Sequence, residues 1–233
     1  DANLGKAGTG VAINNATLAL TDSVDLTHSV SVANTATIDI ANFNSSLMSV
    51  VSGSGTLNKA GTGTLSLQGA NTFNGILDVQ AGRIAINNAN SLGADANSVM
   101  LANGTALETA AAVTAQQAIQ VSGDVSVNTA GHDSTLAGMV SGTGNITKMG
   151  TGTLNLQGVN TFVGNLSVSG GTLGVSTDAN LGAASNKVML NQATLMANLA
   201  SVVLNHEIDI TNTATIDSST NALTLNKQIT GGA

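Results

Sequence analysis

Paired carboxylates are the side chains in this sequence whose spacing comes closest to that of a catalytic centre. Asp22 lies close to Asp25, and Glu207 lies close to Asp209. Two such groups can act as acid and base in the cleavage of a polysaccharide. Neither pair is accompanied by the Arg, Lys and aromatic residues that a sugar cleft normally needs. We therefore expect no enzymatic activity, with a carbohydrate-active enzyme as the alternative.

The histidines do not form a recognisable metal motif. His28 and His206 occupy matching positions of a long repeat, whereas the middle copy has Gln117 there and His132 falls elsewhere. A metal ligand could vary in this way, but we interpret the position as polar and solvent-facing. The chain also has no Cys, no His-Glu-x-x-His and no Asp-rich calcium loop. No metal ion and no cofactor is expected.

Glycine and threonine patterns are also interpreted as structural. The glycine-rich run from Gly53 to Gly63 lacks the Gly-Lys-Ser/Thr ending of a phosphate loop. Thr-x-Thr pairs could form an ice-binding array only if they recurred on every coil, and here each recurs once per long repeat. Threonine is also a good strand former. The pairs are Thr35/Thr37, Thr62/Thr64, Thr151/Thr153 and Thr213/Thr215.

The composition bounds the class of protein. Only 8% of the 233 residues are charged, and the formal net charge is -7. The six basic residues do not cluster, which argues against nucleic acid because phosphates are held by grouped Lys and Arg. No apolar run approaches the roughly 18 residues of a membrane span, so any targeting or anchoring part is expected outside this sequence. The absence of Cys fits a chain that crosses a membrane unfolded.

A repeat of 89 residues organises the whole chain. The stretch from Val51 to Gly75 returns from Val140 to Gly164, and a third copy begins with Ile229-Thr230-Gly231-Gly232. A fixed period of this size indicates one structural unit used several times. We divide residues 1–233 into units 1–88, 89–177 and 178–233 of one continuous domain, the last unit being truncated.

The same stretches carry a family resemblance. The segment from Gly53 to Gly75, with the following Leu77-Asp78-Val79 and Gly82-Arg83-Ile84, resembles the passenger-associated strand repeat of bacterial autotransporters. The segment from Gly142 to Gly164 and its continuation resemble it equally well. Phe73 and Phe162 stand where the family usually has tyrosine. The resemblance implies a right-handed parallel β-helix on a Gram-negative cell surface, and it implies no catalytic residue.

Alternating apolar residues predict short strands with one buried face, as in Leu65/Leu67 and Leu77/Val79. Strands recur about every 20 to 22 residues, which predicts a parallel β-solenoid with about four coils per repeat. Tandem immunoglobulin-like sandwiches of similar length are the alternative. The positions expected to be structural in both copies are Gly61, Gly63, Leu65, Leu67, Gly69, Asn71, Phe73, Gly75, Gly150, Gly152, Leu154, Leu156, Gly158, Asn160, Phe162 and Gly164.

Two local roles follow from this prediction. We expect Gly61, Gly63, Gly150 and Gly152 to form tight corners with positive φ. We expect Asn71 and Asn160 to hydrogen-bond backbone groups inside a turn, with the following phenylalanine ring covering the coil beneath.

The sequence thus predicts a non-enzymatic rod on the outside of a Gram-negative cell, serving adhesion, self-association or the display of a distal tip. A tandem-sandwich adhesin is a further alternative. The partners expected are host or neighbouring-cell surface molecules and other copies of the chain stacked head to tail. Nucleic acid is not expected, and a membrane is contacted only through parts outside this fragment.

Overall fold

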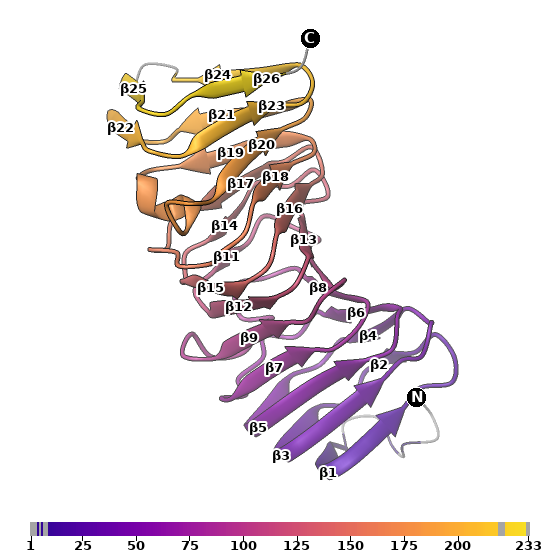
Figure 1. Cartoon of the computed structure of the whole chain (residues 1–233). Helices are drawn as coiled ribbons and strands as arrows, with labels where there is room; N and C mark the ends of the chain where they lie inside the picture. Colours follow the sequence, from indigo (N-terminus) through magenta and orange to yellow (C-terminus); the bar gives the residue numbers. More distant parts are fainter. Residues whose placement is uncertain (1–3, 5, 7–8, 219–221, 232–233) are drawn as a thin grey trace.

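The computed structural model describes residues 4, 6, 9–218 and 222–231, and these form a parallel β-solenoid of about ten coils. The coils stack along one axis from β1 (Val11–Ala19) at one end to β26 (Ile229–Gly231) at the other (Figure 1). Every strand pairing among the described residues is parallel. The sandwich alternative is therefore wrong, because its sheets would be antiparallel. Gly232 of the third repeat copy and the first residues of the chain lie outside the described residues.

The strands belong to three long sheets and one short one. The seven-stranded sheet contains β1, β3 (Val30–Asp39), β5 (Val51–Ala60), β7 (Ile76–Val79), β9 (Ser98–Leu101), β12 (Ala118–Ser122) and β15 (Val140–Thr143). The eleven-stranded sheet contains β2 (Asp25–Leu26), β4 (Ser45–Leu47), β6 (Thr64–Leu67), β8 (Arg83–Ile86), β10 (Ala106–Thr109), β13 (Val125–Asn128), β16 (Ile146–Met149), β18 (Leu166–Val168), β20 (Lys187–Leu190), β23 (Glu207–Ile210) and β26. The six-stranded sheet contains β11 (Thr114–Ala115), β14 (Ser134–Leu136), β17 (Thr153–Leu156), β19 (Gly171–Val175), β21 (Ala193–Ala197) and β24 (Ala214–Asp217), and the short sheet pairs β22 (Ser201–Leu204) with β25 (Ala222–Leu225).

The chain alternates between the seven- and eleven-stranded sheets from β1 to β10 and visits all three long sheets in turn from β10 to β17. It then alternates between the eleven- and six-stranded sheets, with β22 and β25 in the short sheet. From β10 the chain continues through β11 and β12 and returns to the eleven-stranded sheet at β13, one coil further along the axis. A 3-10 turn, η2 (Asp178–Leu181), lies between β19 and β20. The Ala-rich run from Thr109 to Ala118 forms strand and loop, as its Val and Thr content predicts.

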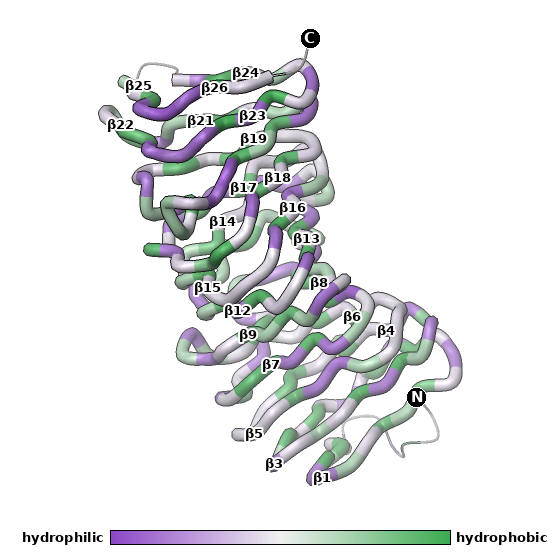
Figure 2. The backbone as a smooth tube through the Cα atoms, viewed as in Figure 1, coloured by the Kyte–Doolittle hydropathy of each residue, from purple (hydrophilic) through white to green (hydrophobic). Residues whose placement is uncertain are grey.

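The core is a set of apolar columns that run along the axis. Leu65, Ile84, Leu107 and Val127 pair directly on successive coils, and all four side chains are buried. Hydrophobic and hydrophilic residues alternate along the strands (Figure 2). Burying each such side chain contributes about 1.5–3 kcal/mol. Because the column needs no large side chain, the fold forms with almost no aromatic residues.

The 89-residue repeat is longer than four coils of the solenoid, and the difference moves a repeated strand to another side. Pairing leads from Ser66 in β6 through β8, β10 and β13 to Met149 in β16, so four coils take 83 residues. The repeat equivalent of Ser66 is Asn155, which lies in β17 of the six-stranded sheet. The expected value of about four coils per repeat is confirmed. At this strand the repeat also advances to another sheet, whereas Val51 and its equivalent Val140 both lie in the seven-stranded sheet.

The glycine corners are of two kinds, and only one of them agrees with the prediction. Gly61 and Gly150 have φ of 83° and 82°, a region that disfavours side chains. Gly63 and Gly152 do not have positive φ, so that prediction is wrong for them. They are required for another reason: a Cβ atom there would fall on the carbonyl of Phe43 or His132 in the coil beneath.

Candidate functional site

The two asparagines of the repeat each join three coils. The Asn71 side-chain oxygen accepts a hydrogen bond from the Val51 amide at 2.7 Å, and its Nδ2 donates to the Ser91 carbonyl at 2.7 Å. Asn160 makes the equivalent contacts with Val140 and Asn180, at 2.7 and 2.6 Å. Each side chain is buried, so these bonds supply partners for backbone groups that water does not reach.

The other repeat positions lie inside the solenoid or against its backbone. Phe73 and Phe162 are fully buried, and their rings contact the positions where a Cβ of Gly93 and Gly182 would lie. The repeat leucines Leu65, Leu67, Leu154 and Leu156 are buried as well. A Cβ at Gly69, Gly75, Gly158 or Gly164 would meet backbone of the preceding coil. These residues pack successive coils against one another.

Two lysines are buried in the core of the solenoid, which the sequence did not lead us to expect. Lys59 and Lys148 have no exposed surface, and each occupies a place in a column of apolar residues. The Lys148 ammonium donates to the carbonyls of Gly150 at 2.7 Å and Gly170 at 3.1 Å, and to Thr129 Oγ1 at 3.1 Å. The ammonium therefore closes a corner and links it to the coils on either side.

The Lys59 ammonium does the same one repeat earlier. It donates to the carbonyls of Gly61, Gly63 and Ala81, the last two at 2.8 Å. Desolvation lowers the pKa of both lysines from 10.5 to about 8, and the nearby carboxylates of Asp39 and Asp133 only partly oppose this. A signal for these residues was present in the sequence. Each lysine takes the inward position two residues after a buried Leu57 or Ile146, at the spacing of the repeat.

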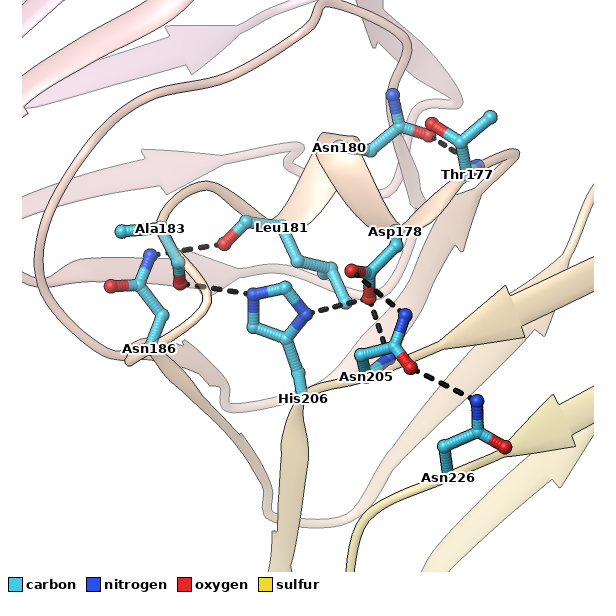
Figure 3. Close-up of polar contacts among 9 residues, drawn as sticks. All are labelled: Thr177, Asp178, Asn180, Leu181, Ala183, Asn186, Asn205, His206 and Asn226. Atoms are coloured by element: carbon cyan, nitrogen blue, oxygen red, sulfur yellow. Dashed lines mark hydrogen bonds and ion pairs between the residues drawn. The ribbon is translucent and has the colours of Figure 1, made fainter.

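A polar cluster joins η2 to the coil of β22 and β23 (Figure 3). Asp178 Oδ1 accepts hydrogen bonds from the Asn205 amide at 2.6 Å and from His206 Nδ1 at 2.8 Å. His206 Nε2 lies 3.0 Å from the carbonyl of Ala183. Because both ring nitrogens face oxygen acceptors, only the imidazolium form donates at both positions.

This cluster corrects the prediction for the histidine position. His28, Gln117 and His206 are all buried, so the position is not solvent-facing. Gln117 Nε2 donates to the carbonyls of Gly93 at 3.0 Å and Ala94 at 3.5 Å, and Ala94 is the repeat equivalent of Ala183. The position therefore provides a donor to a loop of the preceding coil. Glutamine and histidine can both supply a buried hydrogen-bond donor, which explains why the middle repeat has Gln117 where the other two have histidine.

Asp178 gives this cluster its dependence on pH. Burial raises the pKa of its carboxyl group, but the hydrogen bonds from Asn205 and His206 outweigh burial and hold the pKa below its usual 3.8. A depressed pKa contributes stability that is present above the unfolded value and is lost as the pH falls through the folded value.

We predict that Asp178→Asn lowers the free energy of unfolding by about 1–3 kcal/mol at pH 7, because the variant loses charge-assisted hydrogen bonds. Denaturant titration at pH 7 and at pH 3 measures this difference. It should be smaller at pH 3, because the stability that the depressed pKa of Asp178 contributes declines once the pH falls below the unfolded value of 3.8. His206→Gln is the matched variant, since it can keep the bond to Ala183 as Gln117 does. An equal loss for Asp178→Asn at both pH values would contradict the assignment.

The carboxylate pairs do not resemble an acid and base pair. Asp22 and Asp25 are exposed. Glu207 forms an ion pair with Lys187 at 2.7 Å, and Asp209 accepts a hydrogen bond from Thr230 at 3.1 Å. The hydrogen bond and charge of Lys187 lower the pKa of Glu207, whereas a general acid needs a raised pKa.

The part of the chain that the structure describes contains no group of three or more His, Asp or Glu side chains placed to hold a metal ion. Across residues 4, 6, 9–218 and 222–231, no helix is long and apolar enough to cross a membrane.

Comparison with known proteins gives two similarities. Residues 57–86 and 146–175 match the Passenger-associated-transport-repeat family. The chain is also 35% identical over 149 residues to the Adhesin BmaC autotransporter of Brucella suis biovar 1 (strain 1330). This match covers 64% of the chain and about 4% of the length of that relative. No solved structure matches the chain.

Proposed function

We propose, from the premise that this chain is a segment of an autotransporter passenger with passenger-associated transport repeats, that it is a rod-like part of a surface adhesin. Its work is to bind molecules of a host or neighbouring cell, or to hold a more distal part away from its own cell. It acts outside a Gram-negative bacterium and performs no catalysis.

One observation carries this proposal. The two matched repeats form equivalent corners of a continuous solenoid, each closed by a buried lysine and an asparagine that joins three coils. These repeated side chains are committed to holding the rod together. A rod of parallel coils that extends by adding repeats suits reach and display better than turnover of a substrate.

The experiment that tests the adhesive role compares coated particles. Beads carrying the purified chain should bind to host or bacterial cell surfaces more strongly than beads carrying the Gly152→Val variant, whose fold we expect to be disrupted. Beads with His132→Ala, which changes only an exposed side chain and keeps the backbone that Gly152 contacts, provide the matched control and should bind like the native chain. Binding by native beads no greater than by uncoated beads would leave only the role of a spacer.

The enzymatic alternative is tested with acidic and neutral polysaccharides. We expect no cleavage product with the native chain, because Glu207 is held ionised by Lys187 and no aromatic side chain is exposed near it. Cleavage that disappears in Glu207→Gln or Asp209→Asn would overturn the proposal.

Self-association through the ends is a second part of the proposal. Ile216 and Leu225 are only half-buried in the last described coil, whereas their repeat equivalents Val127 and Leu136 are buried. Unpaired strand edges and apolar surface left uncovered in this way recruit further strands. Sedimentation across a concentration series should show species larger than a monomer. A strictly monomeric chain at high concentration would contradict end-to-end stacking.

A further inference from the structure

Three open surface hollows lie at equivalent positions of three successive repeats. The first, of about 300 Å³, is lined by Asn15, Ala16, Thr17, Thr35 and Thr37 between β1 and β3. The second, of about 340 Å³, contains the equivalent residues Gly104, Ala106 and Ser126 and extends from β6 across β8 and β10 to β13, where it is also lined by Thr62, Thr64, Gly82 and Arg83. The third, of about 350 Å³, lies over Gln192, Thr194, Thr213 and Thr215 between β21 and β24. Thr37, Ser126 and Thr215 are each 89 residues apart.

The hollows share a local cause. Each begins at a residue in the left-handed region of the backbone: Asn15 with φ of 48°, Gly104 with φ of 78° and Gln192 with φ of 51°. The chain bends there before it continues as a strand, and the hollow lies beside the bend over the outer faces of neighbouring strands. The feature is therefore part of the repeat rather than an accident of one loop.

The three hollows face three different sides of the rod. The first lies on the seven-stranded sheet, the second on the eleven-stranded sheet and the third on the six-stranded sheet. This follows from the register, because four coils take 83 residues and the repeat of 89 advances by one further side.

The lining defines the chemistry of a ligand. It consists of hydroxyl, amide, methyl and backbone groups, and the single charge in it, Arg83, forms an ion pair with Glu108 at 2.7 Å. Hydroxyl and amide groups both donate and accept hydrogen bonds, as the hydroxyls of a sugar do. Asp39 on β3 and Asp217 on β24 lie on the same strands as the first and third hollows, which disfavours an anionic ligand.

We propose that each repeat carries one binding site for a neutral sugar residue in this hollow, and that successive sites point to successive sides of the rod. The inference rests on the proposed adhesive function and gives it a ligand class. A single glycan chain lying along one side cannot reach two neighbouring sites. Each site therefore engages a separate branch or a separate glycan, and a longer array binds a surrounding mesh of sugars.

The test uses the whole chain with glucose, galactose, mannose and N-acetylglucosamine as probes. Saturation-transfer NMR should show contact with at least one sugar, and amide shifts on titration should appear in all three hollows. Thr35→Val with Thr37→Val removes two hydroxyls and should weaken binding in the first hollow about tenfold, since each lost hydrogen bond costs a few-fold in affinity. Thr213→Val with Thr215→Val should do the same only in the third hollow.

Thr135→Val is the matched control, because Thr135 is an outward threonine of β14 that lies outside the hollows. Valine is a good strand former, so these variants should fold. No contact with any of the four sugars, shifts confined to other parts of the surface, or an equal loss in the control would overturn the proposal. Cell binding by coated beads together with no sugar contact would reject these sites while leaving the adhesive role intact.

Discussion

Replacing Lys148 by alanine is expected to lower the free energy of unfolding by about 3–5 kcal/mol, because buried acceptors lose their donor and a cavity is left behind. The side chain is fully buried, and its ammonium is the common donor to Gly150, Gly170 and Thr129. Alanine removes that donor from three coils at once. Denaturant titration at pH 7 measures the effect.

Two companion variants separate volume from charge. Lys148→Met keeps most of the volume, so its loss should be smaller than that of alanine. Lys187→Met changes an exposed lysine, with 53% of its side chain accessible, and should be close to neutral. An unchanged midpoint for Lys148→Ala would show that the corner carbonyls need no internal donor.

The same lysines should make stability rise on the alkaline side. The pKa of each is lowered to about 8 in the folded chain from 10.5. Between these two values the unfolded chain binds more protons than the folded one, so the free energy of unfolding increases with pH. The increase is on the order of 3 kcal/mol for each lysine. Lys148→Met should remove its share of this rise.

Gly152→Ala is expected to lower the free energy of unfolding by about 3 kcal/mol, the upper end of the usual range for overpacking. Its φ is ordinary, but the added Cβ would fall on the carbonyl and amide of His132 in the coil beneath. Neighbouring coils cannot separate locally without breaking strand pairing, so the clash is not easily relieved. Denaturant titration is again the measurement.

Gly104→Ala is the matched control for this variant. Gly104 has φ of 78°, and a Cβ there would have no heavy atom within 4 Å. It should therefore show only the cost of a left-handed backbone, about 1–2 kcal/mol. If Gly104→Ala were the more damaging of the two, backbone conformation rather than close approach would decide which corners need glycine.

The sequence by itself determined the class of fold and the location of its repeated corners. Alternation at Leu65/Leu67 and Leu154/Leu156 predicted buried strand faces, and the side chains are buried. The 89-residue period and the recurrence of strands about every 20 residues predicted stacked coils with parallel strands. These features depend only on local periodicity, which a single sequence displays directly.

Only the tertiary structure decided what the polar residues do. Lys59, Lys148, His206 and Gln117 look like surface residues in a sequence, yet each is buried with backbone carbonyls as partners from other coils. Likewise Gly152 is required by the backbone of His132, about one coil earlier. The change of sheet between Ser66 in β6 and its repeat equivalent Asn155 in β17 depends on the number of residues in each coil. The contacts between coils and the number of residues in each coil are set by corner geometry and by strand pairing. They therefore follow from the three-dimensional register and not from the order of residues alone.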